Sequence, residues 1–88
     1  MFVITSRNFD KAAARLPPSV RSALKERLEV FMNDPYDRMR KNHRLHGSLR
    51  HYRSINITGD WRAIFREHEN YSLVIFETLG THSQLYKK

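Results

Sequence analysis

The chain has 88 residues, of which 16 are lysine or arginine and nine are aspartate or glutamate, so its formal net charge is +7. This length suits one domain with a modest core, and we expect a single domain over residues 1–88. A hydrophobic share of 40% excludes a disordered chain. The absence of cysteine excludes disulfides and cysteine-based metal sites, and it agrees with a cytoplasmic location. The sequence shows neither a signal peptide nor an apolar run of roughly 18 residues, so we expect no membrane among its partners.

The first half of the chain carries the pattern of one strand followed by two helices. The apolar run Phe2–Ile4 predicts the strand. Apolar residues at helical spacing over 9–16 predict the first helix, and Pro17-Pro18 ends it because neither proline can donate the next backbone hydrogen bond. A second apolar stripe over 20–31 predicts another helix, which Asn33-Asp34-Pro35 ends. Two helices joined by a proline corner form a helical hairpin.

The second half of the chain carries the pattern of three strands. Residues 36–49 show no clean period and are predicted to form a loop. Strands are predicted over 51–57, 61–66 and 71–78, separated by turn residues, and Gly80 is expected to break the last one. The order is β-α-α-β-β-β. It predicts an α+β fold in which the helical hairpin packs on one face of a mainly antiparallel four-stranded sheet.

Positive charge is concentrated in one segment of the chain. From Arg38 to Arg53 there are six lysines or arginines, three histidines and no acidic residue. Arg62, Ile64 and Arg66 alternate with apolar residues, so they predict a basic, partly open sheet face near this segment. The charge favours a polyanionic partner such as nucleic acid over a merely solvated surface or an anionic membrane.

Five histidines in so short a chain indicate acid–base chemistry at neutral pH. Cleavage of RNA needs a base for the 2′-hydroxyl, an acid for the leaving 5′-oxygen and cations for the charged phosphorane, and it needs no metal ion. A solvated histidine is the alternative at each position. A zinc site is a further alternative, but the spacing matches no zinc motif and the surrounding positive charge opposes a cation. The ligands of such a site would be His43, His46 and His51 with Asp60 or His82.

Four short motifs follow one another between His43 and Tyr86, over half of the chain. In this order they resemble YafQ-like members of the RelE/ParE toxin superfamily, whereas the first half agrees only in its helix–helix pattern. The motifs are His43-x-Leu45-x-Gly47, then Tyr52-Arg53, then Gly59-Asp60-Trp61-Arg62, and finally Leu79-Gly80-Thr81-His82-Ser83-Gln84-Leu85-Tyr86.

The resemblance implies a RelE-like fold and the toxin of a type II toxin–antitoxin system. It implies an mRNA interferase, which is a ribosome-dependent, metal-independent endoribonuclease that needs no cofactor and cleaves mRNA in the ribosomal A site by general acid/base catalysis. The expected partners are therefore a cognate antitoxin that wraps the toxin and blocks its site, the ribosome with its rRNA, and mRNA.

The resemblance also implies roles for individual residues. The family's general acid near the C-terminus matches His82, its loop histidine matches His43, and its aspartate before tryptophan matches Asp60. The closing aromatic matches Tyr86, which can stack on a base or orient the substrate. Further contacts with RNA are expected from the cationic residues Arg40, Lys41, Arg44, Arg53, Arg62 and Arg66.

The chain departs from the family pattern at two positions. A second histidine common in YafQ-like toxins is replaced by Asn56, which cannot act as a base, so the base is left to His43 or Asp60. An arginine on the last strand is replaced by Thr78, and its phosphate contact would fall to Arg53, Arg62 or Arg66.

Two other functions are compatible with the same fold. A ParE-like poison of DNA gyrase would not need the matched histidines, aspartate and aromatic. An RNA-binding member with weakened catalysis is the other alternative, and the replacements at Asn56 and Thr78 are the arguments for it.

Overall fold

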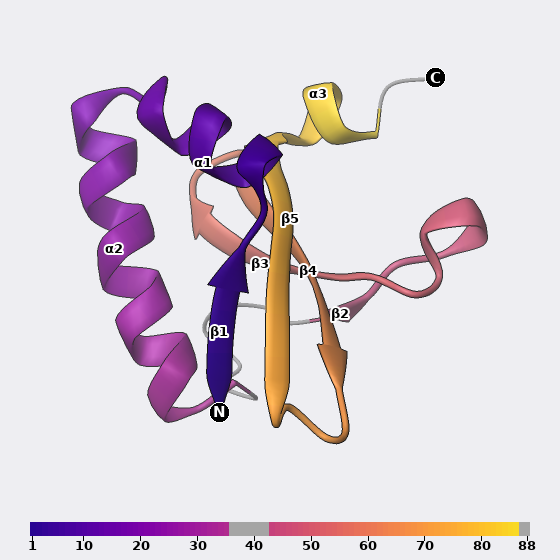
Figure 1. The fold of residues 1–88 in the computed structure, drawn as a ribbon. Coiled ribbons are helices and arrows are strands. Elements are labelled where there is room, and N and C mark those ends of the chain that lie inside the picture. The colour runs from indigo at the N-terminus through magenta and orange to yellow at the C-terminus, as the bar shows by residue number, and fades with distance from the viewer. Residues whose placement is uncertain (36–42, 87–88) are drawn as a thin grey trace.

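One mixed sheet organises the chain, and the computed structural model describes residues 1–35 and 43–86 of it. The sheet order is β1-β5-β4-β3-β2, with β1 parallel to β5 and the other neighbours antiparallel (Figure 1). The predicted α+β fold is confirmed, and β2 adds a two-residue edge strand that we did not predict. The elements are β1 (Phe2–Thr5), α1 (Arg7–Ala14), α2 (Pro18–Asn33), β2 (His43–Arg44), the 3-10 turn η2 (Gly47–Leu49), β3 (Arg53–Thr58), β4 (Trp61–His68), β5 (Leu73–Thr81) and α3 (His82–Leu85).

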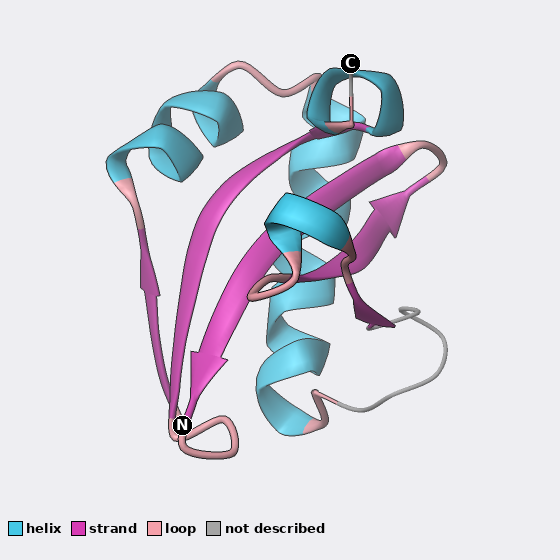
Figure 2. Cartoon of the chain, turned by 90° about the vertical axis from the view of Figure 1, so that its right-hand side faces the viewer, coloured by secondary structure: helices cyan, strands magenta, loops and turns pink. Residues whose placement is uncertain are grey.

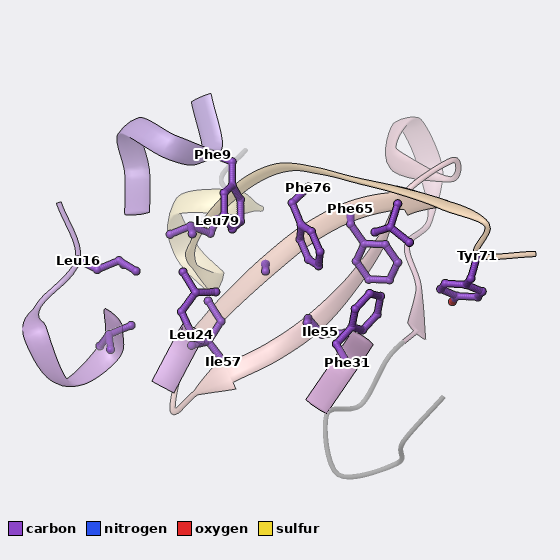
Figure 3. Close-up of a cluster of buried hydrophobic side chains, with 13 residues drawn as sticks. Phe9, Leu16, Leu24, Phe31, Ile55, Ile57, Phe65, Tyr71, Phe76 and Leu79 are labelled. Atoms are coloured by element: carbon purple, nitrogen blue, oxygen red, sulfur yellow. The ribbon is translucent and has the colours of Figure 1, made fainter. Parts of the chain in front are cut away.

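The core lies between the sheet and the first two helices. Phe31 of α2 is fully buried, and its ring meets Phe65 edge-on with centroids 5.0 Å apart (Figure 3). It also lies 5.5 Å from Phe76, whose other neighbour at 5.5 Å is Phe9 of α1. Such aromatic pairs add about 0.5–1.5 kcal/mol each beyond the area they bury. Helices α1 and α2 therefore cover the sheet face that carries Phe65.

The opposite sheet face is partly covered by the segment between β2 and β3. Figure 2 shows η2 in front of the sheet and α2 behind it. Ile64 faces away from the helical layer but is only 5% exposed. It lines a hollow together with Leu49 and Tyr52, which come from the β2–β3 segment. We call this side of the sheet, away from α1 and α2, the open face. It forms a groove and is not flat.

β5 carries one more residue than β4 in the middle of their ladder. The pairing runs from Phe65–Phe76 directly to Ile64–Thr78, so Glu77 has no partner on β4. A bulge of this kind shifts the alternation of side chains beyond it by one position.

The bulge decides which face the end of β5 presents. Phe76 and Leu79 both lie in the core, although three positions separate them. Gly80 consequently lies opposite Arg62, on the face away from the helices. We expected Gly80 to break the strand, and this was wrong, because β5 continues through it to Thr81.

Ser6 joins the start of α1 to the bulge. Its hydroxyl donates to the carbonyl of Glu77 at 2.6 Å, and the same oxygen accepts the backbone N–H of Phe9 at 3.0 Å. Its own N–H donates to the carbonyl of Phe76 at 2.9 Å. Ser6 thus caps the helix and satisfies a carbonyl that the bulge removes from the β4 ladder.

Three predicted boundaries differ from the structure for local reasons. The first predicted strand of the second half begins later, at Arg53, because residues 50–51 form a turn after η2. β4 extends to His68. Tyr71 belongs to a turn and not to β5, since its φ of +69° follows two other left-handed residues. The predicted loop over 36–49 contains β2 and η2 in its described part, 43–49.

No helix in the described ranges is long and apolar enough to span a membrane.

Replacing Ser6 by alanine should lower the free energy of unfolding by about 1–2 kcal/mol, because it removes a helix cap and leaves a strand carbonyl unsatisfied. Ser22→Ala is the matched control, since Ser22 is exposed on α2 and its change should stay within about 0.5 kcal/mol. Urea denaturation followed by circular dichroism measures both. Equal stabilities of the two variants would show that the hydrogen bonds of the Ser6 hydroxyl contribute nothing to stability.

Candidate active site

A hollow of about 450 Å³ opens on the sheet face away from α1 and α2. Its size lies in the range of roughly 300–1,000 Å³ that small-ligand sites occupy. Leu45 and Leu49 supply its apolar wall. We call it the His82 hollow, and its polar lining consists of His46, Ser54, Asn56, Arg62, His82 and Tyr86.

The short helix α3 positions two of these side chains. Thr81 and Gln84 form a capping box, in which the Thr81 hydroxyl accepts from the Gln84 N–H at 3.3 Å and the Gln84 amide oxygen accepts from the Thr81 N–H at 2.9 Å. The His82 N–H donates to the carbonyl of Asp60 at 3.0 Å, which fixes α3 to the β3–β4 turn. Tyr86 follows one turn later, with its ring centroid 4.7 Å from that of His82.

Arg62 places a positive charge in the hollow, and backbone carbonyls of the β3–β4 turn hold that charge in position. Its Nη1 donates to the carbonyls of Gly59 at 2.9 Å and Trp61 at 3.2 Å, so the turn itself anchors the guanidinium group. No carboxylate lines the hollow in the described part of the chain. Nor do three histidine, aspartate or glutamate side chains gather anywhere within 1–35 and 43–86 as a metal site would need. The ionisable groups among these lining residues are imidazole, guanidinium and phenol.

His46 is a lining residue that our sequence reasoning assigned only to a zinc site. It is exposed and immediately precedes η2. The hairpin that carries it is closed by a hydrogen bond from the Leu45 N–H to the Tyr52 carbonyl at 3.0 Å. The sequence signal for His46 was its place inside the motif His43-x-Leu45-x-Gly47, at a position where the motif allows any residue.

The structure places the three residues expected to be catalytic in different ways. His82 lines the hollow. Asp60 adjoins it through its backbone carbonyl, but its exposed side chain is not part of the lining. The backbone of His43 pairs with Ser54, which is fully buried at the floor of the hollow, and the side chain of His43 lies outside the described structure.

The residues expected to bind substrate divide into several groups. Arg62 and Tyr86 line the His82 hollow, whereas Arg44 and Arg53 line a separate hollow of about 190 Å³. Arg66 lies on the open face, with its Nε 3.0 Å from a carboxylate oxygen of Glu77. The contact is an ion pair by distance but lacks hydrogen-bond geometry at Nε. Partly exposed pairs contribute about 0–1 kcal/mol, so an anion could compete for Arg66. Arg40 and Lys41 lie outside the described residues.

Comparison with known proteins identifies relatives of the chain. Residues 4–87 match the family model described as a bacterial toxin of a type II toxin–antitoxin system, YafQ. The crystal structure of YafQ from E. coli is 26% identical, with a TM-score of 0.77 and 96% of each chain covered. YafQ in the E. coli DinJ–YafQ toxin–antitoxin complex is 25% identical, with a TM-score of 0.77, covering 96% of this chain and 94% of that one.

A more distant structure shows the same fold. The archaeal RelE–RelB complex from Pyrococcus horikoshii is 16% identical, with a TM-score of 0.73, covering 94% of this chain and 96% of that one. Among curated proteins, no significant match is found.

Replacing Gly80 by alanine should displace α3. An added Cβ would lie 3.0 Å from the Gln84 amide oxygen and 3.4 Å from a Leu85 methyl group, so the capping box must shift by a few tenths of an ångström. We expect the ring NMR signals of His82 and Tyr86 to move while those of Phe65 stay in place. Ser22→Ala, exposed on α2, should move none of them. Unchanged His82 and Tyr86 signals in Gly80→Ala would mean that the packing at Gly80 does not position α3.

Proposed function

The chain belongs to the YafQ family of bacterial toxins of type II toxin–antitoxin systems, and from this we propose that it is a metal-independent endoribonuclease that cleaves mRNA in the A site of the ribosome. One observation carries the proposal. An imidazole, His82, a guanidinium group held by turn carbonyls, Arg62, and an aromatic ring, Tyr86, line a single hollow on a basic chain.

The proposed reaction is an attack of the ribose 2′-oxygen on the adjacent phosphorus. A base removes the 2′-proton as the new P–O bond forms, and an acid protonates the 5′-oxygen as the old P–O bond breaks. The products are a 2′,3′-cyclic phosphate and a free 5′-hydroxyl. Negative charge accumulates on the phosphorane oxygens between these two events, and a fixed cation stabilises it there.

The lining residues suit these tasks. His82 is the general acid in this proposal, and the anchored guanidinium of Arg62 stabilises the phosphorane. Tyr86 stacks on a base, as aromatic side chains do in single-stranded RNA sites. Family resemblance offers His43 or Asp60 as the base, and the structure adds His46, which lines the hollow directly. Asn56 lines it too, and its amide can position substrate but cannot take a proton.

The groove continues beyond the hollow along the open face. A neighbouring hollow of about 360 Å³ shares Leu49 with the first and is lined further by Tyr52, Ile64, Glu77 and Thr78. Thr78, which replaces a family arginine, therefore faces this extension and not the hollow itself. The absence of a cation at Thr78 predicts weaker contact with a neighbouring phosphate than with the one at Arg62.

An antitoxin is part of the proposed function. The related YafQ of E. coli has been crystallised in complex with DinJ. We expect this chain's partner to lay an acidic segment over the basic groove, because opposite charges speed association and fix its orientation. Such a segment is partly disordered when free and folds on binding.

Replacing His82 by alanine or glutamine should lower the rate of RNA cleavage by ~10²–10⁴-fold, the usual contribution of a positioned acid. Glutamine can donate a hydrogen bond but cannot transfer the proton. The measurement is single-turnover cleavage of ribosome-bound mRNA, scored by primer extension, beside thermal melts.

The control for this pair is His68→Ala, which removes an exposed histidine at the far end of β4. It should cleave at the parent rate. If His82→Gln also cleaves at the parent rate, His82 is not the acid. If the parent protein blocks translation without cutting mRNA, the proposed nuclease function itself is wrong.

Cleavage should survive removal of metal ions, because side chains of the protein carry out every step of the proposal. The test adds EDTA to the cleavage reaction within the range in which sedimentation shows the ribosomes to be intact. We expect no more than a twofold change in rate. Complete loss that zinc restores would replace this mechanism with a metal-dependent one.

A further inference from the structure

The second hollow, of about 190 Å³, lies on the other side of the β2–β3 hairpin from the His82 hollow. Neighbouring residues of a strand point to opposite faces, so Leu45 and Ser54 line the first hollow whereas Arg44 and Arg53 line the second. We call this second site the Arg44 hollow, and its remaining lining consists of Arg50, His51, Tyr52 and Glu67.

Three arginine side chains line the Arg44 hollow together, so like charges lie close to one another there. Arg44 and Arg53 are direct partners in the β2–β3 ladder, and like charges directly opposite one another destabilise a sheet. Arg50 brings a third guanidinium group from the turn after η2. None of the three arginines belongs to the buried hydrophobic cluster, so packing of the core does not explain why they lie together.

Glu67 offsets only part of this charge. It is the one carboxylate in the described lining, against three guanidinium groups. One of its oxygens already accepts the backbone N–H of Tyr71 at 2.9 Å, which holds the left-handed turn before β5. The described lining of the Arg44 hollow therefore carries more positive than negative side chains, and it would attract an anion.

We propose that the Arg44 hollow binds a phosphodiester group of an RNA backbone, as an anchor separate from the site of cleavage. Guanidinium forks match the oxygens of a phosphate in pairs, and three of them surround this space. The volume is several times the roughly 30 Å³ of one water molecule, so it admits a tetrahedral anion. The rings of Tyr52 and His51 give the adjoining nucleoside an aromatic surface.

This inference rests on the proposed function for its choice of RNA as the polyanion. Because the hairpin separates the two hollows, the anchored stretch of RNA differs from the stretch that is cut. The anchor should therefore set affinity and leave the chemical step unchanged.

The test measures binding of a 2′-O-methyl RNA oligonucleotide, which cannot be cleaved through its 2′-oxygen, by fluorescence anisotropy at several salt concentrations. The variant is Arg44→Gln with Arg50→Gln, both exposed. Arg7→Gln with Arg15→Gln is the control, since it removes two exposed arginines from the helical layer. We expect at least tenfold weaker binding for the first pair, with a log–log salt slope lower by about 0.7 per lost phosphate contact, and at most a twofold effect for the control.

Further measurements make the outcome decisive. Thermal melts check folding, and the single variant Arg50→Gln replaces the pair if the pair does not fold. Single-turnover cleavage at saturating protein should keep the parent rate in the variant. Equal RNA affinity of variant and control would overturn the proposal. An acidic peptide is titrated in the same assay, and a loss of affinity for the peptide alone would also overturn it, because the hollow would then bind a protein partner. The binding assay requires no cleavage, so a failure of the nuclease function would be seen separately in primer extension.

Discussion

One residue of β5, Glu77, has no partner on β4, and this bulge determines which way the end of β5 faces. With the bulge, Leu79 joins the core and Gly80 lies opposite Arg62, so the chain leaves the sheet beside the guanidinium group. The hydroxyl of Ser6 holds the bulge from the first helix, and the capping box of Thr81 then turns the chain into α3. The position of His82 therefore depends on two local features, the bulge in β5 and the helix cap at Thr81, and on the aromatic core that supports the sheet.

The β2–β3 hairpin lines two hollows on opposite faces. Its alternation sends one set of side chains to the His82 hollow and the other to the Arg44 hollow. From the basic segment, the first hollow receives His46 and the second receives Arg44, Arg50 and Arg53. The cation of the His82 hollow is Arg62 of β4, which turn carbonyls hold in place, and this suits chemistry. In the Arg44 hollow several arginines lie together, which suits attraction of a polyanion.

The helices and the main strands could be predicted because each follows its own period, 3.6 or 2, in the apolar residues. That reasoning fails at the bulge, since strict alternation assigns Thr78 to the core, and only the pairing with β4 reveals the shift. His82, Arg62 and Tyr86 could be predicted from motif resemblance. His46 could not, because the motif leaves its position free, and the pairing of Arg66 with Glu77 depends on a neighbouring strand that local sequence does not show.

The parallel pairing of β1 with β5 has a consequence for how the protein is made. Phe2 lies opposite Leu73 and Thr5 opposite Phe76, so β1 cannot form its pairing until β5 has been synthesised. Pairings between residues so distant in sequence form slowly, and the ribosome delivers the chain from its N-terminal side. Neither the β1–β5 pairing nor the His82 hollow can form while β5 is still in the exit tunnel. The His82 hollow therefore forms only late in the synthesis of the chain, once β5 has been released.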